Sequence, residues 1–162
     1  MASLTSVLDE AGVRYELLPH AHTESAVAEA NALGLSTSEV AKTLIVKAPS
    51  GYRRAVLAAE DRIDLGKLSE LYGETKKAVQ LADEADLRRE YPEFELGAVP
   101  PFGGAHDDPV VVDRRLAERE SVVLEAGSHD ESIRIATADL LRLTKAHVAD
   151  ICKEDVSRND RD

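Results

Sequence analysis

The sequence predicts an α+β fold, a single domain built on a mixed, largely antiparallel sheet flanked by short helices. The chain has 162 residues and is 43% hydrophobic, which suits one domain with one core. Helix and strand patterns are interspersed, but the strands come in hairpin-like pairs with short links, and this disfavours a doubly wound parallel sheet. We expect one domain over residues 1–152 and a polar tail over 153–162.

The first part of the chain carries two helix patterns and one strand pattern. Residues 4–11 predict a short helix that ends at Gly12, since glycine adopts the left-handed conformation of a helix C-terminus without strain. RYELL (14–18) alternates in polarity, which is typical of a strand. The Ala-rich segment 23–34 ends in glycine and predicts a second helix, and the capping-box spacing of STSE (36–39) indicates a turn.

A β-hairpin is predicted next. AKTLIVKA (41–48) and YRRAVLAAE (52–60) are typical strand sequences, and a Pro-Ser-Gly turn separates them. After the hairpin, Asp64 is the predicted N-cap of the helix LGKLSELYG (65–73), which its last glycine closes.

The second half begins with KKAVQLA (76–82), which is predicted to be extended, and with Asp83 as the N-cap of a helix over 84–90. Thr137 is the predicted cap of a late helix, ADLLRLT. Four further strands are predicted over 109–113, 121–126, 132–136 and 148–152.

The charge balance restricts the function classes. Twenty basic and 31 acidic residues give a net charge of −11, which disfavours a generic nucleic-acid binder and predicts no DNA partner. A local basic site remains compatible with this sum, and Arg53, Arg54, Lys67, Lys76, Lys77, Arg88 and Arg89 could gather into a basic rim or lie separately in solvent.

The cellular compartment of the protein is predicted from sequence features that are missing. Cys152 is the single cysteine, so the chain can form no internal disulfide. The N-terminus has no signal-peptide pattern, and no apolar stretch approaches the about 20 residues that span a bilayer. We expect a soluble cytoplasmic protein with no membrane partner.

Several common catalytic motifs are missing, among them GxGxxG, GxxxxGK[ST], HExxH and GxSxG. The consecutive residues Ser128, His129 and Asp130 have the residue types of a catalytic triad. They cannot align as nucleophile, base and orienting acid, because consecutive side chains point in different directions. His20 and His22, or His106-Asp107-Asp108 with Asp113, offer possible metal ligands, but no spacing matches a known ligand pattern. We therefore predict neither a metal nor a cofactor.

Lys42 is the first candidate site residue. Strand alternation puts Val40, Lys42, Leu44 and Val46 on one face of the predicted strand, so the ammonium sits among aliphatic side chains. It either reaches out to water or serves as a fixed cation for an anionic ligand such as phosphate.

The uncharged stretch LGAVPPFG (96–103) is the second candidate. Gly97 allows close approach of its backbone N–H to a ligand, while Pro100 and Pro101 fix the chain direction and donate no hydrogen bond. Such a stiff loop can present a preorganised donor to a carbonyl or oxyanion, or it can simply join a helix to a strand.

A family resemblance connects these segments. VAKTLIVKA, YRRAVLAAEDRIDLGKLSELYG, LGAVPPFG, VVVD and EAG…IRI…ADLLRL, in this order, resemble the YbaK/prolyl-tRNA-synthetase-associated editing-domain family over roughly residues 23–151. The resemblance implies a curved sheet and an aminoacyl-tRNA deacylase that removes Ala or Cys from tRNA(Pro). A chain of 162 residues without synthetase modules resembles the free-standing, trans-acting members.

The resemblance also implies roles for particular residues. Lys42 matches a lysine that holds the terminal adenosine, and Gly97, Ala98, Val99, Pro100 and Pro101 match a loop whose backbone faces the aminoacyl ester. Asp113 matches an acidic residue near the pocket, although a strand-end turn would also explain it. His129 matches a polar pocket residue or is a loop histidine, and His22 and Thr23 could line the entrance.

The implied mechanism needs no metal and no protein nucleophile. Lys42 anchors the adenosine, the Gly97 N–H polarises the ester carbonyl, and a tRNA hydroxyl or a substrate thiol assists the attack. The implied partners are the aminoacyl end of tRNA and prolyl-tRNA synthetase. Two alternatives stay open: a non-catalytic module that binds a nucleotide-like ligand or a synthetase, and a small-molecule hydrolase or metal enzyme using His20, His22 and His129.

Overall fold

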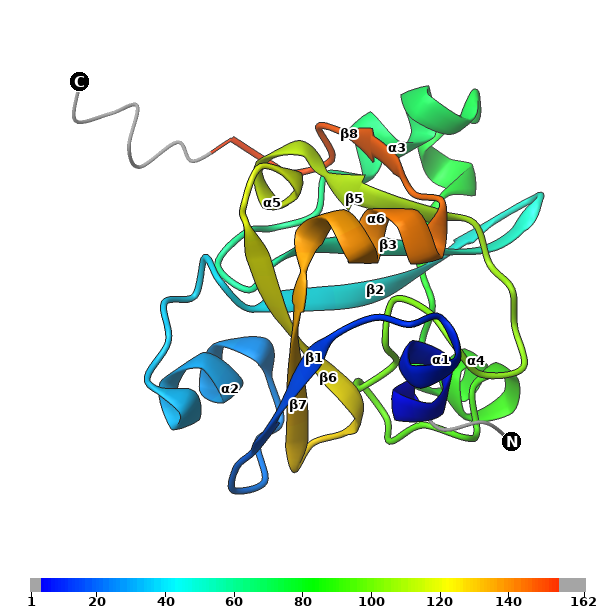
Figure 1. Ribbon diagram of the computed structural model, residues 1–162. Helices are drawn as coiled ribbons and strands as arrows, with labels where there is room; N and C mark the ends of the chain where they lie inside the picture. Colours follow the sequence, from blue (N-terminus) through cyan, green and yellow to red (C-terminus); the bar gives the residue numbers. More distant parts are fainter. Residues whose placement is uncertain (1–3, 155–162) are drawn as a thin grey trace.

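The computed structural model describes residues 4–154 of the chain, which alternate between short helices and strands (Figure 1). In chain order the elements are α1 (Leu4–Glu10), β1 (Tyr15–Pro19), α2 (Ala26–Leu33), β2 (Ala41–Ala48), β3 (Gly51–Ala58), α3 (Leu65–Tyr72), the 3₁₀ turn η1 (Lys76–Ala78), β4 (Gln80–Leu81), α4 (Glu84–Glu90), β5 (Val110–Asp113), α5 (Arg114–Ala117), β6 (Ser121–Ser128), β7 (Glu131–Ala136), α6 (Thr137–Thr144) and β8 (His147–Ala149).

The strands form two sheets. The smaller sheet has the order β1-β7-β6, and both of its pairs are antiparallel. The larger sheet has the order β4-β2-β3-β5-β8; it is antiparallel around β2 and parallel from β3 to β8. An isolated bridge between Val40 and Val123 links the two sheets. The predicted α+β class with a mixed, largely antiparallel sheet is confirmed, whereas the sequence patterns indicate one sheet rather than two.

The larger sheet is buried on both faces. Val56 and Val112 point into a core shared with α1, α6 and the smaller sheet. Leu57 and Val111 point the other way, into a second core with Leu68 of α3. Figure 1 shows α6 on the near side of this sheet and α3 on the far side. Cover on both faces explains the continuous apolar runs in β5 and in the second half of β3, residues 55–58.

The predicted helix ends are largely confirmed. Asp64 accepts hydrogen bonds from two backbone N–H groups at the start of α3, and Asp83 forms a capping box at the start of α4. Gly34 and Gly73 end α2 and α3 in the left-handed region, with φ of 68° and 69°.

Two local predictions are wrong, and one short helix is not predicted from the sequence. The segment 76–82 is not one extended run, because η1 precedes the two-residue strand β4. The four-residue helix α5 is too short to show a periodic pattern. Thr137 is the first residue of α6 rather than its side-chain cap, and its buried Oγ1 has no partner among the described residues.

Within residues 4–154 no helix is both long enough and apolar enough to cross a bilayer. The polar tail predicted over 153–162 lies, from residue 155 onward, outside the described residues.

Candidate active site

A pocket of about 200 Å³ opens beside β2 and brings several predicted site residues together. Within the described chain, β4 pairs with β2 at Val46 and Lys47 alone, so the preceding part of β2 keeps an open edge there. The pocket is lined by Ser25, Ala26, Ala41, Lys42, Thr43, Leu44, Gly97, Val99, Pro100, Leu124 and Glu125. Two other predicted residues of the loop, Ala98 and Pro101, are buried and do not line it.

The ammonium of Lys42 is held in place by two backbone carbonyls. Its Nζ donates to the backbone carbonyls of Ala59, at 3.2 Å, and Asp61, at 2.6 Å. An ammonium has three N–H donors, so one is left for a ligand in the pocket. Burial lowers the pKa of Lys42, while the two carbonyls favour the charged form. The side chain is therefore a fixed, half-buried cation rather than one that reaches into bulk water.

A buried arginine fixes the loop that faces Lys42. The guanidinium of Arg54, whose side chain is 1% exposed, donates to the carbonyls of Pro100 and Gly103 at 2.8 Å each and of His106 at 3.1 Å. It also pairs with Asp108 at 3.1 Å. The prolines thus stiffen the loop locally, and Arg54 ties it to β3. The sequence patterns do not assign this role to Arg54.

The backbone at Gly97 needs glycine. Its φ is 84°, a conformation that side chains rarely adopt, and an added Cβ would contact the ring of His129 at 3.7 Å. The Nε2 of His129 lies 2.7 Å from the Leu96 carbonyl, which can only accept, so Nε2 carries a hydrogen. Because the C=O and N–H of one peptide unit point in opposite directions, holding the Leu96 carbonyl also fixes the direction of the Gly97 N–H. No described residue accepts from that N–H.

The His129 ring is held on its other side by Glu125. Nδ1 of the ring is 2.8 Å from Oε2 of Glu125, and the imidazole is 4% exposed. Burial raises the pKa of Glu125 to about 7. Burial lowers the pKa of His129, but the hydrogen bond to Leu96 and the charge of Glu125 outweigh it and raise that pKa overall. Glu125 is a pocket residue that the sequence patterns do not indicate.

Comparison with known proteins assigns this pocket to a family. The profile of the aminoacyl-tRNA editing domain matches residues 20–143, a range that contains every residue lining the pocket. The chain belongs to this family.

Relatives of the editing domain agree with that assignment. The chain is 27% identical over 147 residues to the Multifunctional Ser/Thr-tRNA deacylase ProXp-y of Escherichia coli (strain K12), covering 88% of this chain and 86% of the relative. It is 32% identical over 136 residues to the uncharacterized protein YwhH of Bacillus subtilis (strain 168), covering 82% and 84%. A crystal structure of a candidate trans-editing enzyme for prolyl-tRNA synthetase superposes with a TM-score of 0.81 at 27% identity, covering 93% of this chain and 95% of that one. The predicted family resemblance is confirmed.

Asp113 does not line the pocket of the editing domain. Its side chain accepts from the backbone N–H of Arg115, as the N-cap of α5, and from the N–H of Ile151. These contacts give the residue the structural role of a strand-end turn, which is the alternative explanation of its position in the sequence.

The predicted entrance residues lie beside His129. The His22 ring packs edge-on against the His129 ring, with 5.4 Å between centroids, and bonds to Glu24 and Asp130. The Thr23 N–H donates to the carbonyl of His129 at 3.1 Å, while its buried Oγ1 has no partner among the described residues. Neither side chain lines the pocket, although both precede the lining residue Ser25.

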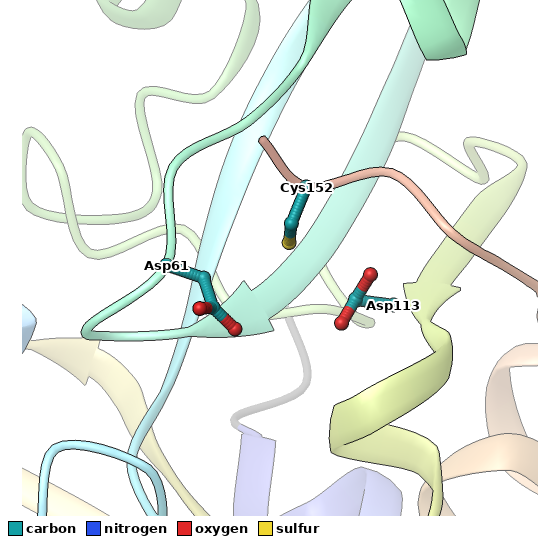
Figure 2. A group of neighbouring side chains, drawn as sticks. All are labelled: Asp61, Asp113 and Cys152. Atoms are coloured by element: carbon teal, nitrogen blue, oxygen red, sulfur yellow. The ribbon is translucent and has the colours of Figure 1, made fainter. Parts of the chain in front are cut away.

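The predicted metal ligands do not form a group of three in the described part of the chain, although Nδ1 of His106 lies 3.7 Å from Asp108. In the described part of the chain, the group with metal-ligand geometry is Asp61, Asp113 and Cys152, whose ligand atoms lie within 4.8 Å of one another (Figure 2). Asp113 already bonds two backbone N–H groups, and burial raises the pKa of the Cys152 thiol, which disfavours the thiolate that binds metals. His20 instead bonds the Ser132 hydroxyl at 2.9 Å.

The hypothetical basic rim is also dispersed. Arg53 stacks over the Tyr72 ring at 4.1 Å, Arg54 is internal, and Lys67 bonds Asp150. Arg88 and Arg89 pair with acidic side chains of their own helix.

Proposed function

We propose that the chain is a trans-acting deacylase that hydrolyses the ester between tRNA and a small, wrongly attached amino acid. The observation that carries this proposal is that the fixed cation Lys42 and the braced loop at Gly97 line one pocket in an editing domain. The E. coli relative is named a tRNA deacylase, and the similar crystal structure is named for trans-editing with prolyl-tRNA synthetase. We propose tRNA(Pro) carrying Ala or Cys as substrate and prolyl-tRNA synthetase as partner.

The proposed division of labour follows the geometry. The remaining N–H of Lys42 binds the anionic and hydroxyl groups of the terminal adenosine, because a charge-assisted hydrogen bond is strong in a half-buried site. The Gly97 N–H, aimed by His129, donates to the ester carbonyl and stabilises the oxyanion that forms on it. Val99 and Pro100 form the wall against the amino-acid side chain.

The attacking group is water rather than a side chain of the protein. The hydroxyl of Ser25 accepts the N–H of Ala28 at 3.1 Å as a helix cap, and Cys152 is buried outside the pocket. Water adds to the carbonyl carbon, the bond to the tRNA oxygen breaks, and that oxygen takes the proton as it leaves. An aminoacyl ester is already activated, so positioning and charge stabilisation suffice.

A panel of charged tRNAs tests the proposal. We expect the purified protein to release at least one small amino acid from tRNA(Pro) charged with Ala, Cys, Ser or Thr, and to leave prolyl-tRNA(Pro) intact, because the rigid wall excludes the larger ring. Release is measured from the labelled amino acid. Protein dialysed against a chelator is expected to keep its rate in magnesium buffer. Binding without release of any amino acid would refute the deacylase and leave the binding module.

Substitution of Gly97 tests the loop. We expect Gly97→Ala to lower kcat/KM for deacylation by at least about 10-fold, because a side chain at this φ displaces the N–H that meets the ester. The matched control is Gly73→Ala at the end of α3, where φ is 69° and no atom lies within 4 Å of the added Cβ. Both variants should lose about 1 kcal/mol of unfolding free energy. Equal activities of the two variants would contradict the assigned role.

A further inference from the structure

Glu125 lines the pocket, and one of its two carboxylate oxygens has no hydrogen-bond partner among the described residues. The side chain is 12% exposed and comes from β6, at the register shift between Glu125 and Ser128. Such irregularities redirect side chains away from the regular pleat. One oxygen, Oε2, lies 2.8 Å from His129 Nδ1, and no described residue bonds Oε1. A nearly buried carboxylate with free lone pairs, placed at a pocket, is poised for a donor from a ligand.

The surroundings make this end of the pocket acidic. The groups that face Glu125 and its partner His129 are Glu24, 4.0 Å from Nε2 of His129, Glu95, 3.3 Å from the His129 backbone N, and the ring of His22. The fully buried Glu29 of α2 is also near, but burial raises its pKa to about 8, so it adds no negative charge near neutral pH. Leaving out Glu29, the acidic side chains of Glu24, Glu95 and Glu125 still outnumber the two imidazoles of His22 and His129. Lys42 lies in the same pocket with its ammonium fixed by two carbonyls. The pocket therefore offers both a cationic and an anionic group.

An aminoacyl adenosine has the complementary polarity. Its phosphodiester is anionic, and the α-amino group of the ester is an ammonium below its pKa, which for α-amino groups is about 8. A ligand that places the phosphate side at Lys42 brings its α-ammonium to the anionic wall. A cation there also relieves the cost of a buried carboxylate with an unpaired oxygen.

We propose that Glu125 is a specificity-determining residue whose free carboxylate oxygen binds the α-ammonium of the aminoacyl group. This inference rests on the proposed function, since it names the part of the proposed substrate that the residue recognises. It makes the pocket selective for esters of α-amino acids over otherwise similar acyl esters, in addition to selecting for size.

The test compares two substrates that differ at one group. Alanyl-tRNA(Pro), or seryl-tRNA(Pro) where the panel finds serine the better substrate, is set beside its α-hydroxy counterpart, made by nitrous acid deamination. We expect Glu125→Gln to lower kcat/KM for the aminoacyl ester by about 10- to 100-fold at near-neutral pH, the range for losing a charge-assisted hydrogen bond. The rate with the hydroxyacyl ester should change by less than about 3-fold, since its neutral hydroxyl does not need the carboxylate charge. The ratio of the two rates is the measured quantity.

Glu95→Gln is the matched control, because Glu95 belongs to the same acidic group but does not line the pocket. It should leave the ratio unchanged. If Glu125→Gln lowered kcat/KM equally for both substrates, the inference would be overturned. Glu125 would then support the loop through His129 or activate the attacking water. An unchanged ratio with full activity would also overturn it. If the unaltered protein hydrolyses no member of the panel, the proposed function itself fails.

Discussion

Replacing Lys42 by alanine is expected to lower kcat/KM for deacylation by about 100-fold or more while the domain stays folded. The ammonium is the pocket's only described lysine or arginine group, and the carbonyls of Ala59 and Asp61 hold it in one position. A charge-assisted bond to the adenosine end contributes about 1.5–3 kcal/mol, and misplacement of the ester costs more. Single-turnover deacylation, with circular dichroism and urea unfolding on the same samples, measures both effects.

Lys47 provides the control within the same strand. It lies five residues later on the opposite face of β2, its side chain is 53% exposed, and it pairs with Asp86 at 3.3 Å. Lys47→Ala removes the same charge from the protein, so its activity should stay within about 2-fold of the unaltered chain. A Lys42→Ala variant as active as Lys47→Ala would show that the pocket works without its cation.

Local signals carry most of the fold prediction. The caps Asp64 and Asp83 and the hairpin of β2 and β3 depend on residues close in sequence, so their patterns suffice. The division into two sheets depends on which distant strands pair, such as β3 with β5, and no short pattern encodes that pairing. Thr137 fails for a related reason, because packing buries a hydroxyl that local rules would place at a cap.

The candidate site likewise has residues that the sequence alone indicates and residues that it does not. The sequence indicates Lys42 because it is a charged residue on an apolar strand face, and it indicates the loop at Gly97 because this stretch is uncharged and rich in proline and glycine. It does not indicate Arg54 or Glu125, although a signal exists for Arg54: alternation in β3 places it on the same face as Val56 and Ala58. An arginine on an apolar face needs buried acceptors, but which ones depends on a loop more than 40 residues away. Glu125 needs both its bulge and the position of His129, which only the folded chain supplies.

Removal of the Arg54 guanidinium is expected to have the largest effect on stability. Arg54→Met should cost about 3–5 kcal/mol of unfolding free energy, because it leaves the buried carboxylate of Asp108 without its cation and three carbonyls without their donor. Arg54→Lys keeps the charge but offers three donors from a single nitrogen, so about 2 kcal/mol should be lost and the domain should still fold. Urea unfolding at constant pH gives both values.

The activity of Arg54→Lys then separates support of the loop from stability alone. The Pro100 carbonyl sits on the same loop as the Gly97 N–H, so a loosened loop should lower kcat/KM by about 10-fold even where the variant is fully folded. Arg53→Ala is the neighbouring control: this guanidinium covers the Tyr72 ring on the other face of β3, and its loss should cost about 1 kcal/mol and no activity. If folded Arg54→Lys retained the full rate, the prolines alone would hold the loop, and the arginine would serve only the core.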